Sequence, residues 1–199
     1  MKSTFHIILV ALLLGAGSPL VGQKTALLLI DIQDFYFPGG QMQLENPGQA
    51  GMNAGLVLEQ FRKKSYPVYH VRHNFEPGGS IHQYVKPVEG EMIFSKDQVN
   101  AFLETGLLEA LRADSVEALV LCGMQTHMCL EAAVRAGHDF GFDITVVQDA
   151  CATRALQYEE LIIPAKSVHY STIKTIEGTY AKVISTEELL GDFDQFVGE

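Results

Sequence analysis

The sequence predicts a single α/β domain: a doubly wound, mainly parallel sheet with helices on both of its faces. Apolar runs that suit buried strands alternate along the chain with segments of helical period. The length of 199 residues suits one such domain and is short for two, and no repeat or low-complexity tract interrupts the alternation. A hydrophobic content of 47% against 19% charged residues excludes a chain that is disordered throughout.

The first half of the chain sets this pattern. Residues 25–31 form a continuously apolar run up to a closing carboxylate, which is typical of a strand covered on both faces. In residues 50–64 the apolar side chains recur at i, i+3, i+4 and i+7, which predicts an amphipathic helix. Residues 67–71 favour a second strand. The polar stretch 73–90, rich in Gly and Pro, is typical of a long loop that walls a pocket.

The second half repeats the alternation. Helices are indicated by apolar residues at helical spacing, strands by short apolar runs, and element ends by Gly, Ser or Thr. The expected elements are a helix at 105–113, a strand at 118–122, a helix at 126–137, a strand at 144–149, a helix at 165–178, a strand at 181–184, and a terminal helix capped by Ser185 or Thr186.

Residues 1–22 are predicted to be an export signal peptide, which leaves residues 23–199 as the folded domain. A Lys near the start precedes an apolar run from Phe5 to Leu14, and small residues and a proline follow. The run is too short to span a bilayer, although an uncleaved N-terminal anchor is the alternative. We therefore expect an exported protein, periplasmic or secreted, with no membrane attachment once the signal is removed.

The charge balance and the cysteines exclude several classes of protein. There are 14 Lys and Arg against 24 Asp and Glu, a formal charge of −10, and no basic block occurs. We therefore expect neither nucleic acid nor an anionic membrane surface as a partner. Three cysteines are too few for a disulfide scaffold. No G-x-G-x-x-G follows the first strand, which disfavours a dinucleotide-binding enzyme.

Three chemically competent side chains fall where ligands bind in such sheets, beyond the carboxyl ends of the strands. Asp31 closes the first strand, Cys129 follows the third, and Lys96 lies between them in the chain. Each alone has a plainer interpretation: a turn-forming Asp, a solvated Lys, and a buried Cys on the core face of a helix. If Thr126 caps that helix, Cys129 lies in its first turn, where the helix dipole favours the thiolate.

Four ordered segments make the interpretation specific, because together they resemble the isochorismatase-like cysteine hydrolases. The likeness runs in order over residues 25–190. The three segments that resemble the signature segments of that family are LLLIDIQDF at 27–35, IFSK at 93–96 and GMQTHMC at 123–129, and VVQDA at 146–150, followed by Ala152 and Thr153, resembles its next strand.

The resemblance implies a catalytic triad of Asp31, Lys96 and Cys129, an acyl-enzyme on the cysteine, and no cofactor. Asp31 would take the thiol proton and later activate water, while Lys96 would stay charged. Backbone N–H groups of Gln125 and Cys129 would form the oxyanion hole, and the peptide bond between Met124 and Gln125 would be cis.

Two departures from the family pattern bear on the substrate. Nicotinamidases of the family carry an Asp-x-His metal motif, whereas His70 and His73 have no carboxylate at ligand spacing and would point to opposite faces of a strand. No metal is therefore expected. Isochorismatases proper carry Asp at the position of Cys129, which argues against vinyl-ether hydrolysis. What remains is a metal-free hydrolase of a C–N bond in a small amide, imide-derived or ureido compound.

Pocket assignments rest on proximity to the triad alone. The candidates are Gln33, Phe37, Arg72, His127 and Met128. Arg72 could bind a substrate carboxylate or pair with a structural acid, and Gln33 could orient the catalytic Asp or form a turn. The expected partners are a small-molecule substrate and further copies of the same chain, because members of the family commonly self-associate.

Two other functions stay open. One is a non-hydrolytic, redox-active thiol protein in which Cys129 is oxidised or pairs with Cys122 or Cys151. The other is a catalytically idle member of the same fold, for which Lys96 would lie far from Cys129.

Overall fold

The structure, a computed structural model, describes residues 24–197, so the export signal expected at residues 1–22 lies outside the described part. Six parallel strands form one sheet, and two further short strands form an antiparallel hairpin, β6 (Leu156–Tyr158) with β7 (Leu161–Ile163). In spatial order the sheet strands are β3 (Met92–Lys96), β2 (Val68–His73), β1 (Thr25–Ile30), β4 (Ala118–Met124), β5 (Asp143–Ala152) and β8 (Lys182–Ile184).

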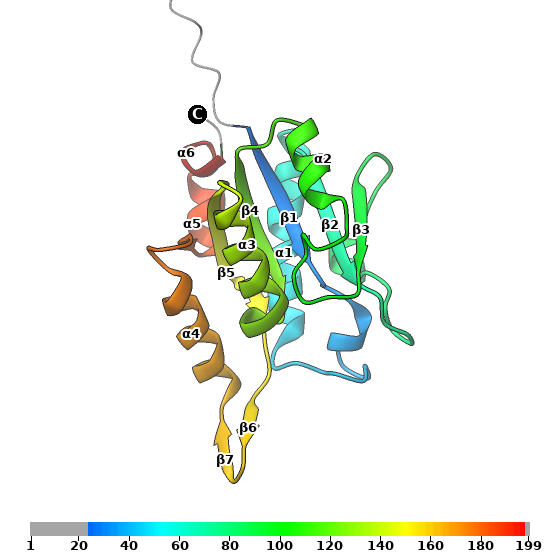
Figure 1. The fold of residues 1–199 in the computed structure, drawn as a ribbon, viewed down its shortest axis with the longest axis vertical. Coiled ribbons are helices and arrows are strands. Elements are labelled where there is room, and N and C mark those ends of the chain that lie inside the picture. The colour runs from blue at the N-terminus through cyan, green and yellow to red at the C-terminus, as the bar shows by residue number, and fades with distance from the viewer. Residues whose placement is uncertain (1–23, 198–199) are drawn as a thin grey trace, which may run out of the picture.

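Helices cover both faces of this sheet, which confirms the predicted fold class (Figure 1). The helices are α1 (Pro47–Lys63), α2 (Leu107–Ala113), α3 (Glu131–Asp139), α4 (Ala165–Ile176), α5 (Thr186–Gly191) and α6 (Phe193–Val197). The shorter turns are the 3-10 helices η1 (Asp34–Tyr36) and η2 (Gln83–Val85), and the π-helix η3 (Thr126–Leu130).

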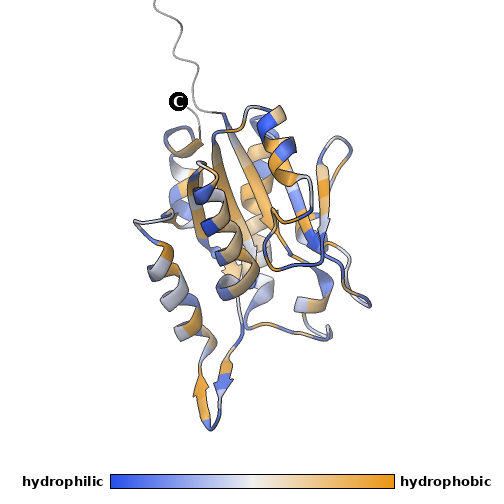
Figure 2. Ribbon diagram, viewed as in Figure 1, coloured by the Kyte–Doolittle hydropathy of each residue, from blue (hydrophilic) through white to orange (hydrophobic). Residues whose placement is uncertain are grey.

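Side chains of β1 alternate between two apolar layers, one on each face of the sheet. Leu27 and Leu29 pack in the layer that contains α1, α5 and α6. Leu28 and Ile30 pack in the layer that contains α2, α3 and α4. Because both faces of β1 and β4 are buried, these strands are apolar apart from Thr25 at the start of β1, as Figure 2 shows at the centre of the molecule.

The sequence does not predict β3 or the β6–β7 hairpin. β3 is a five-residue edge strand with only Lys96 fully buried, so its side chains show no alternation that a pattern could reveal. Each hairpin strand has three residues, and most of their side chains are exposed or half-buried. β5 also continues to Ala152, beyond the expected end at residue 149.

A capping box stabilises the start of α5. Ser185, one of the two expected caps, accepts a hydrogen bond from Glu188 N, and the Glu188 carboxylate accepts from Ser185 N in return. Among residues 24–197 no helix combines the length and the apolar character needed to cross a bilayer.

Candidate active site

Three different elements bring Asp31, Lys96 and Cys129 together at the carboxyl edge of the sheet. Asp31 follows β1, Lys96 ends β3, and Cys129 lies in η3 directly after β4. Lys96 Nζ lies 2.8 Å from Asp31 Oδ2 and donates a hydrogen bond of 3.2 Å to Cys129 Sγ. The side chains of Asp31 and Lys96 are fully buried, and Cys129 is 6% exposed. Asp31 and Lys96 therefore form a buried ion pair next to the Cys129 thiol. The plainer interpretation made them a turn-forming residue and a solvated side chain.

Backbone geometry at the ends of β1 and β4 makes room for this cluster. Asp31 adopts a left-handed conformation with φ of 50°, and its N–H donates to Val71 O at 2.9 Å. Gly123 has φ of 152°, and a Cβ added there would lie 2.2 Å from Ile30 O. Only glycine lets β4 approach β1 this closely at the point where the chain turns toward Cys129. The peptide bond that follows, Met124–Gln125, is cis.

The Lys96 ammonium has two further partners. It lies 3.2 Å from His73 Nδ1 and donates to Gln98 O at 3.1 Å. His73 ends β2, between β1 and β3, so the lysine side chain reaches past it to Asp31. The sequence offers no signal for His73 as a neighbour of the site, because the pairing depends on the unrecognised strand β3. These contacts fix the ammonium rather than leaving it to rotate.

The protonation states of the acid and the thiol follow from burial. Burial raises the pKa of Asp31, and the opposing attraction of Lys96 does not cancel the effect. Burial, and then the nearby charge of Asp31, raise the pKa of Cys129 to about 12 despite the Lys96 ammonium. Burial therefore disfavours the thiolate of Cys129, contrary to the expectation from the start of a helix.

The segment that carries the cysteine, residues 125–130, is called the nucleophile turn below. Thr126 is not the cap of its helix: the cap position is Gln125, and no side chain caps it. Thr126 Oγ1 instead lies 3.0 Å from Nδ1 of His169, a residue of α4. The Gln125 side chain donates to Tyr36 OH at 3.4 Å and accepts from Arg154 Nε at 3.2 Å. Residues from three other parts of the chain thus hold the turn.

Two of the expected pocket residues flank the nucleophile. His127 and Met128 are half-buried. His127 Nδ1 lies 2.6 Å from Thr153 Oγ1, and burial, together with the positive Arg154, lowers the pKa of this histidine. Met128 packs against the apolar layer of α3. The sequence missed Arg154, Tyr36 and His169, because each reaches the nucleophile turn only through the tertiary fold.

The other three predicted pocket residues make contacts within the protein. The Gln33 amide donates to His73 O and Gly79 O and accepts from His73 N, so it ties the long loop to β2 instead of facing a substrate. Phe37 is buried and stacks on His82 at a centroid distance of 3.5 Å. Arg72 donates to Ser95 Oγ and precedes His73 in the strand, so its side chain lies on the sheet face opposite to the Lys96 cluster.

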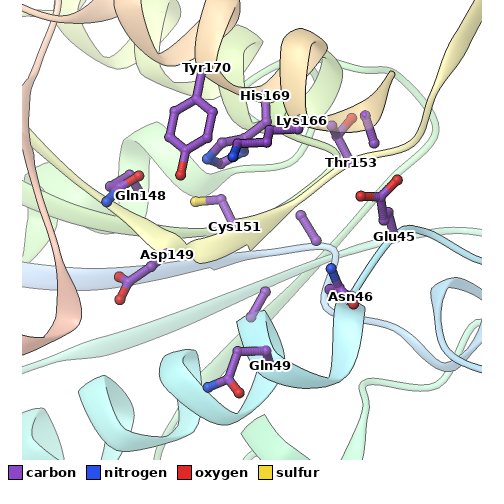
Figure 3. A pocket seen from close by; sticks show the side chains of 13 residues that line it. Glu45, Asn46, Gln49, Gln148, Asp149, Cys151, Thr153, Lys166, His169 and Tyr170 are labelled. Carbon is purple, nitrogen blue, oxygen red and sulfur yellow. The ribbon is translucent and has the colours of Figure 1, made fainter. Parts of the chain in front are cut away.

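A cavity of about 270 Å³ opens beside the nucleophile turn, between the start of α1, the end of β5 and the start of α4 (Figure 3). Charges of both signs line it, including Glu45, Asp149 and Lys166. His169 and Thr153, which contact the nucleophile turn, also belong to the lining, whereas Cys129 does not. The cavity is therefore a neighbour of the triad and not the space directly above the thiol.

No cluster of three or more metal-ligating side chains occurs within residues 24–197. His70 and His73 do have separate partners: His70 Nε2 lies 2.9 Å from Glu91 Oε2, and His73 contacts Lys96. The three cysteines of the described chain, Cys122, Cys129 and Cys151, are all buried and unpaired.

Comparison with known proteins places the chain in a family. The isochorismatase domain model matches residues 25–188. The isochorismatase family protein YddQ of Bacillus subtilis (strain 168) is 44% identical over 83% of this chain and 98% of its own length. The crystal structure of an isochorismatase from Pseudomonas putida KT2440 is 31% identical, with a TM-score of 0.79 over 83% of this chain and 89% of its own. A maleamate amidohydrolase of Pseudomonas putida KT2440 is 24% identical over 89% of this chain and 90% of its own length. The chain therefore belongs to the isochorismatase family of hydrolases.

Proposed function

We propose that the protein is a metal-free cysteine hydrolase that cleaves a C–N bond in a small amide, imide-derived or ureido compound through an acyl-enzyme on Cys129. The observation that carries the proposal is the position of Lys96 Nζ, 2.8 Å from Asp31 and 3.2 Å from the Cys129 sulfur. An acid, an ammonium and a thiol that are buried in mutual contact match the parts that nucleophilic acyl transfer needs.

In the first half-reaction, the Asp31 carboxylate takes the thiol proton as the Cys129 sulfur attacks the carbonyl carbon. A raised pKa makes Asp31 a stronger base than an ordinary aspartate, which suits a thiol that is hard to ionise. The negative charge that develops on the carbonyl oxygen is met by the N–H groups of Gln125 and Cys129. Asp31 then returns its proton to the leaving nitrogen, the C–N bond breaks, and a thioester remains.

In the second half-reaction, water attacks the thioester carbonyl carbon. Asp31, again a carboxylate, accepts a proton from the water, and the C–S bond breaks with return of the proton to the sulfur. The products are a carboxylic or carbamic acid and an amine or ammonia. Lys96 remains an ammonium throughout and stabilises the negative sulfur in both half-reactions.

The amide substrate class is supported by the maleamate amidohydrolase relative and by the cysteine itself. The chain has a cysteine at the position that the resemblance assigns to the nucleophile, and that side chain can form an acyl intermediate. The redox alternative has less support, because susceptibility to oxidation follows thiolate character and exposure. Cys129 is buried and its pKa is raised. The idle-scaffold alternative is favoured if amides give no turnover and Lys96 lies far from Cys129, and these two side chains are in contact.

The test is an activity screen of the wild type beside Cys129→Ala on monoamides, ureido acids and half-amides of dicarboxylic acids, read as ammonia or amine release. Intact-mass measurement during turnover should show a covalent adduct on the wild type equal to the acyl group, and none on Cys129→Ala. Turnover that survives in Cys129→Ala, with no adduct on the wild type, would contradict the mechanism.

We also propose that residues 1–22 direct export. Expression of the full chain in a Gram-negative host should then yield a periplasmic protein that begins near Gln23, as read by intact mass. A full-length chain recovered only from the cytoplasm would contradict the proposal.

A further inference from the structure

A second cavity, of about 470 Å³, lies between the ends of β2 and β3 and the long loop that joins these two strands at the edge of the sheet. It is called the Arg72 cavity below. Its polar lining side chains are Arg72, Lys86, Ser80 and Ser95. No carboxylate of residues 24–197 lines it, whereas charges of both signs line the cavity beside the nucleophile turn. The lining therefore combines two cations with two hydroxyl groups.

The guanidinium of Arg72 keeps most of its hydrogen-bond donors unused. Its Nε donates to Ser95 Oγ at 3.0 Å, which accounts for one of its N–H groups. In the described part of the chain neither this guanidinium nor the Lys86 ammonium has a carboxylate within ion-pair distance, and Lys86 Nζ makes no hydrogen bond. Because Arg72 is half-buried, its charge has lost part of its hydration without gaining an anionic partner.

A nearby arginine shows the arrangement that Arg72 lacks. Arg62 donates from Nε and Nη2 to the two carboxylate oxygens of Glu91, at 2.7 and 2.8 Å. Acidic residues outnumber basic ones by 24 to 14 in the chain, yet none within residues 24–197 pairs with Arg72. The free guanidinium fork therefore matches a carboxylate or phosphate group of a ligand, because both anions accept two parallel N–H bonds from such a fork.

The rest of the lining is apolar and comes from Ile81 and Pro87 of the loop and Ile93 of β3. The Ile93 side chain is 52% exposed and lies on the same side of the sheet as Ser95, two residues further along the strand. An apolar group that covers Ile93 would be stabilised by the removal of both surfaces from water. The cavity volume lies in the range of small-molecule sites, roughly 300–1,000 Å³. The cavity thus suits a small molecule with an anionic group and an apolar body.

Alternation along the strands separates this cavity from the triad. Arg72 pairs with Ser95 in register, and the residues that follow them directly, His73 and Lys96, pair with each other. Successive side chains of a strand point to opposite faces, so Arg72 lies on the face that α1 covers and the Lys96 cluster lies on the other. A ligand in the Arg72 cavity would therefore leave the space around the thiol free.

We propose that the Arg72 cavity binds a small organic anion, a carboxylate or phosphate monoester with an apolar body. Arg72 and Lys86 hold the anionic group, and Ile93 packs against the apolar body. Since Arg72 belongs to β2 and Lys86 to the loop, the bound anion ties the loop to the sheet.

The loop that the anion holds is also bonded to the segment that follows β1. Asp34 N donates to Ser80 O at 3.0 Å, and His82 N donates to Ile32 O at 2.8 Å. Occupation of the cavity should therefore restrain the loop between two parts of the sheet and slow amide exchange at residues 80–88. The inference does not depend on the proposed function, because it concerns binding and loop mobility and not turnover.

Binding is tested by NMR titration of the ¹⁵N-labelled protein with phenylacetate and phenyl phosphate, and with neutral 2-phenylethanol as the matched control. None of the three contains an amide. At least one anion should saturate with a Kd of about 1 mM, shift the amide signals of residues 86–95, and bind at least about 10-fold more tightly than the alcohol. The tighter anion identifies the preferred group. Equal binding of the alcohol, no saturation by either anion at about 50 mM, or shifts centred on the nucleophile turn would overturn the proposal.

Variants assign the charge that binds the anion. Arg72→Gln should weaken anion binding by about 10-fold or more and leave binding of 2-phenylethanol unchanged, because a charge-assisted hydrogen bond is lost. Arg72→Lys, which keeps the charge without the fork, should lie between the two. Lys86→Gln, at an exposed position where the fold is not at risk, should weaken binding about 3-fold or more. The control is Arg112→Gln, at an exposed position of α2 outside the cavity, which should bind as the wild type does. Unchanged affinity in both Arg72→Gln and Lys86→Gln would contradict the site.

Hydrogen exchange read by mass spectrometry tests the tie between loop and sheet. The tighter of the two anions, at saturation, should slow exchange at residues 80–88 of the wild type by about 3-fold or more. Exchange in α2 serves as the internal control and should not change. Arg72→Gln at the same anion concentration should show a smaller effect. A saturated wild type whose loop exchanges at the rate of the free protein would show that the anion does not bridge Arg72 and Lys86.

Discussion

Lys96 Nζ lies 2.8 Å from Asp31 Oδ2 in a place where neither side chain has any contact with solvent. The transfer of two charges from water to such a site costs several kcal/mol for each ion, and the mutual attraction offsets this cost only when the contacts are good. Lys96 also contacts Cys129, His73 and Gln98, and these contacts add to the attraction of Asp31 in offsetting the cost of burying the charges. Replacement of a buried ion pair by apolar side chains is often neutral for stability, so the proposed role of this pair is its effect on the neighbouring sulfur.

The pair predicts non-additive stability. Lys96→Met leaves a carboxylate buried without its cation and should lower the free energy of unfolding by about 3–5 kcal/mol. The double variant Asp31→Asn with Lys96→Met should recover part of that loss, because no unpaired charge remains. Urea unfolding measures both, with the exposed Lys63→Met as control, which should stay within about 0.5 kcal/mol of the wild type. Additive effects of the two substitutions would show that the ion pair is not coupled.

Replacement of the nucleophile should separate chemistry from folding. Cys129→Ala should remove measurable turnover and leave a cooperatively folded protein, because the substitution deletes only one sulfur atom from a buried site. Cys151→Ala is the matched control: that thiol is also buried, and its sulfur donates to Val147 O, yet it should retain kcat. Equal losses of kcat in the two variants would indicate a packing effect.

The pH dependence of kcat/KM should report Asp31. Because burial raises the pKa of this carboxyl above 3.8, activity should rise with pH through an inflection that lies above 3.8, as the carboxylate forms. Asp31→Asn should lower kcat/KM by about two to four decades and remove that inflection. Steady-state rates between pH 4 and 9 test this. If kcat/KM of Asp31→Asn rises with pH in the same way, the titrating group is not Asp31.

The raised pKa of Asp31 also has a consequence for stability, of opposite sign. The folded protein binds this proton more tightly than the unfolded chain, so the contribution of Asp31 is complete below pH 3.8 and is lost as pH rises through the folded-state pKa. The free energy of unfolding of Asp31→Asn should therefore increase relative to that of the wild type as pH rises from 3.8 through the folded-state pKa of Asp31. A stability difference between the two proteins that is independent of pH would contradict the assignment.

Glu91 anchors the end of the long loop away from the triad. Burial alone would raise its pKa, but hydrogen bonds from Arg62, Val88 and His70 outweigh burial and lower the pKa to about 2. Its contribution, on the order of 3 kcal/mol, is present above pH 4.5 and is lost as pH falls toward 2. Glu91→Gln should cost about 2–3 kcal/mol at pH 7 in urea unfolding and flatten the acid dependence, while kcat changes little.

The sequence was informative wherever burial is continuous or the helical period is unbroken. β1 and β4 are almost entirely apolar because helices cover both of their faces. α1 keeps its apolar residues at helical spacing because only one side of it faces the sheet. It was uninformative at β3 and the β6–β7 hairpin, which are short and largely exposed, so that no periodic burial marks their residues. The pocket assignments of Gln33, Phe37 and Arg72 rest on proximity in the chain, which does not fix which way a side chain points.

Sequence alone determined the fold class, the family and the three side chains of the candidate triad, since these depend on local apolar patterns and on short ordered segments. Only the tertiary structure decided that burial raises the pKa of the thiol, that His73, Arg154, Tyr36 and His169 surround the triad or hold the nucleophile turn, and that the β6–β7 hairpin forms. Protonation depends on desolvation and on charges brought in from distant strands, and both exist only after the chain has folded.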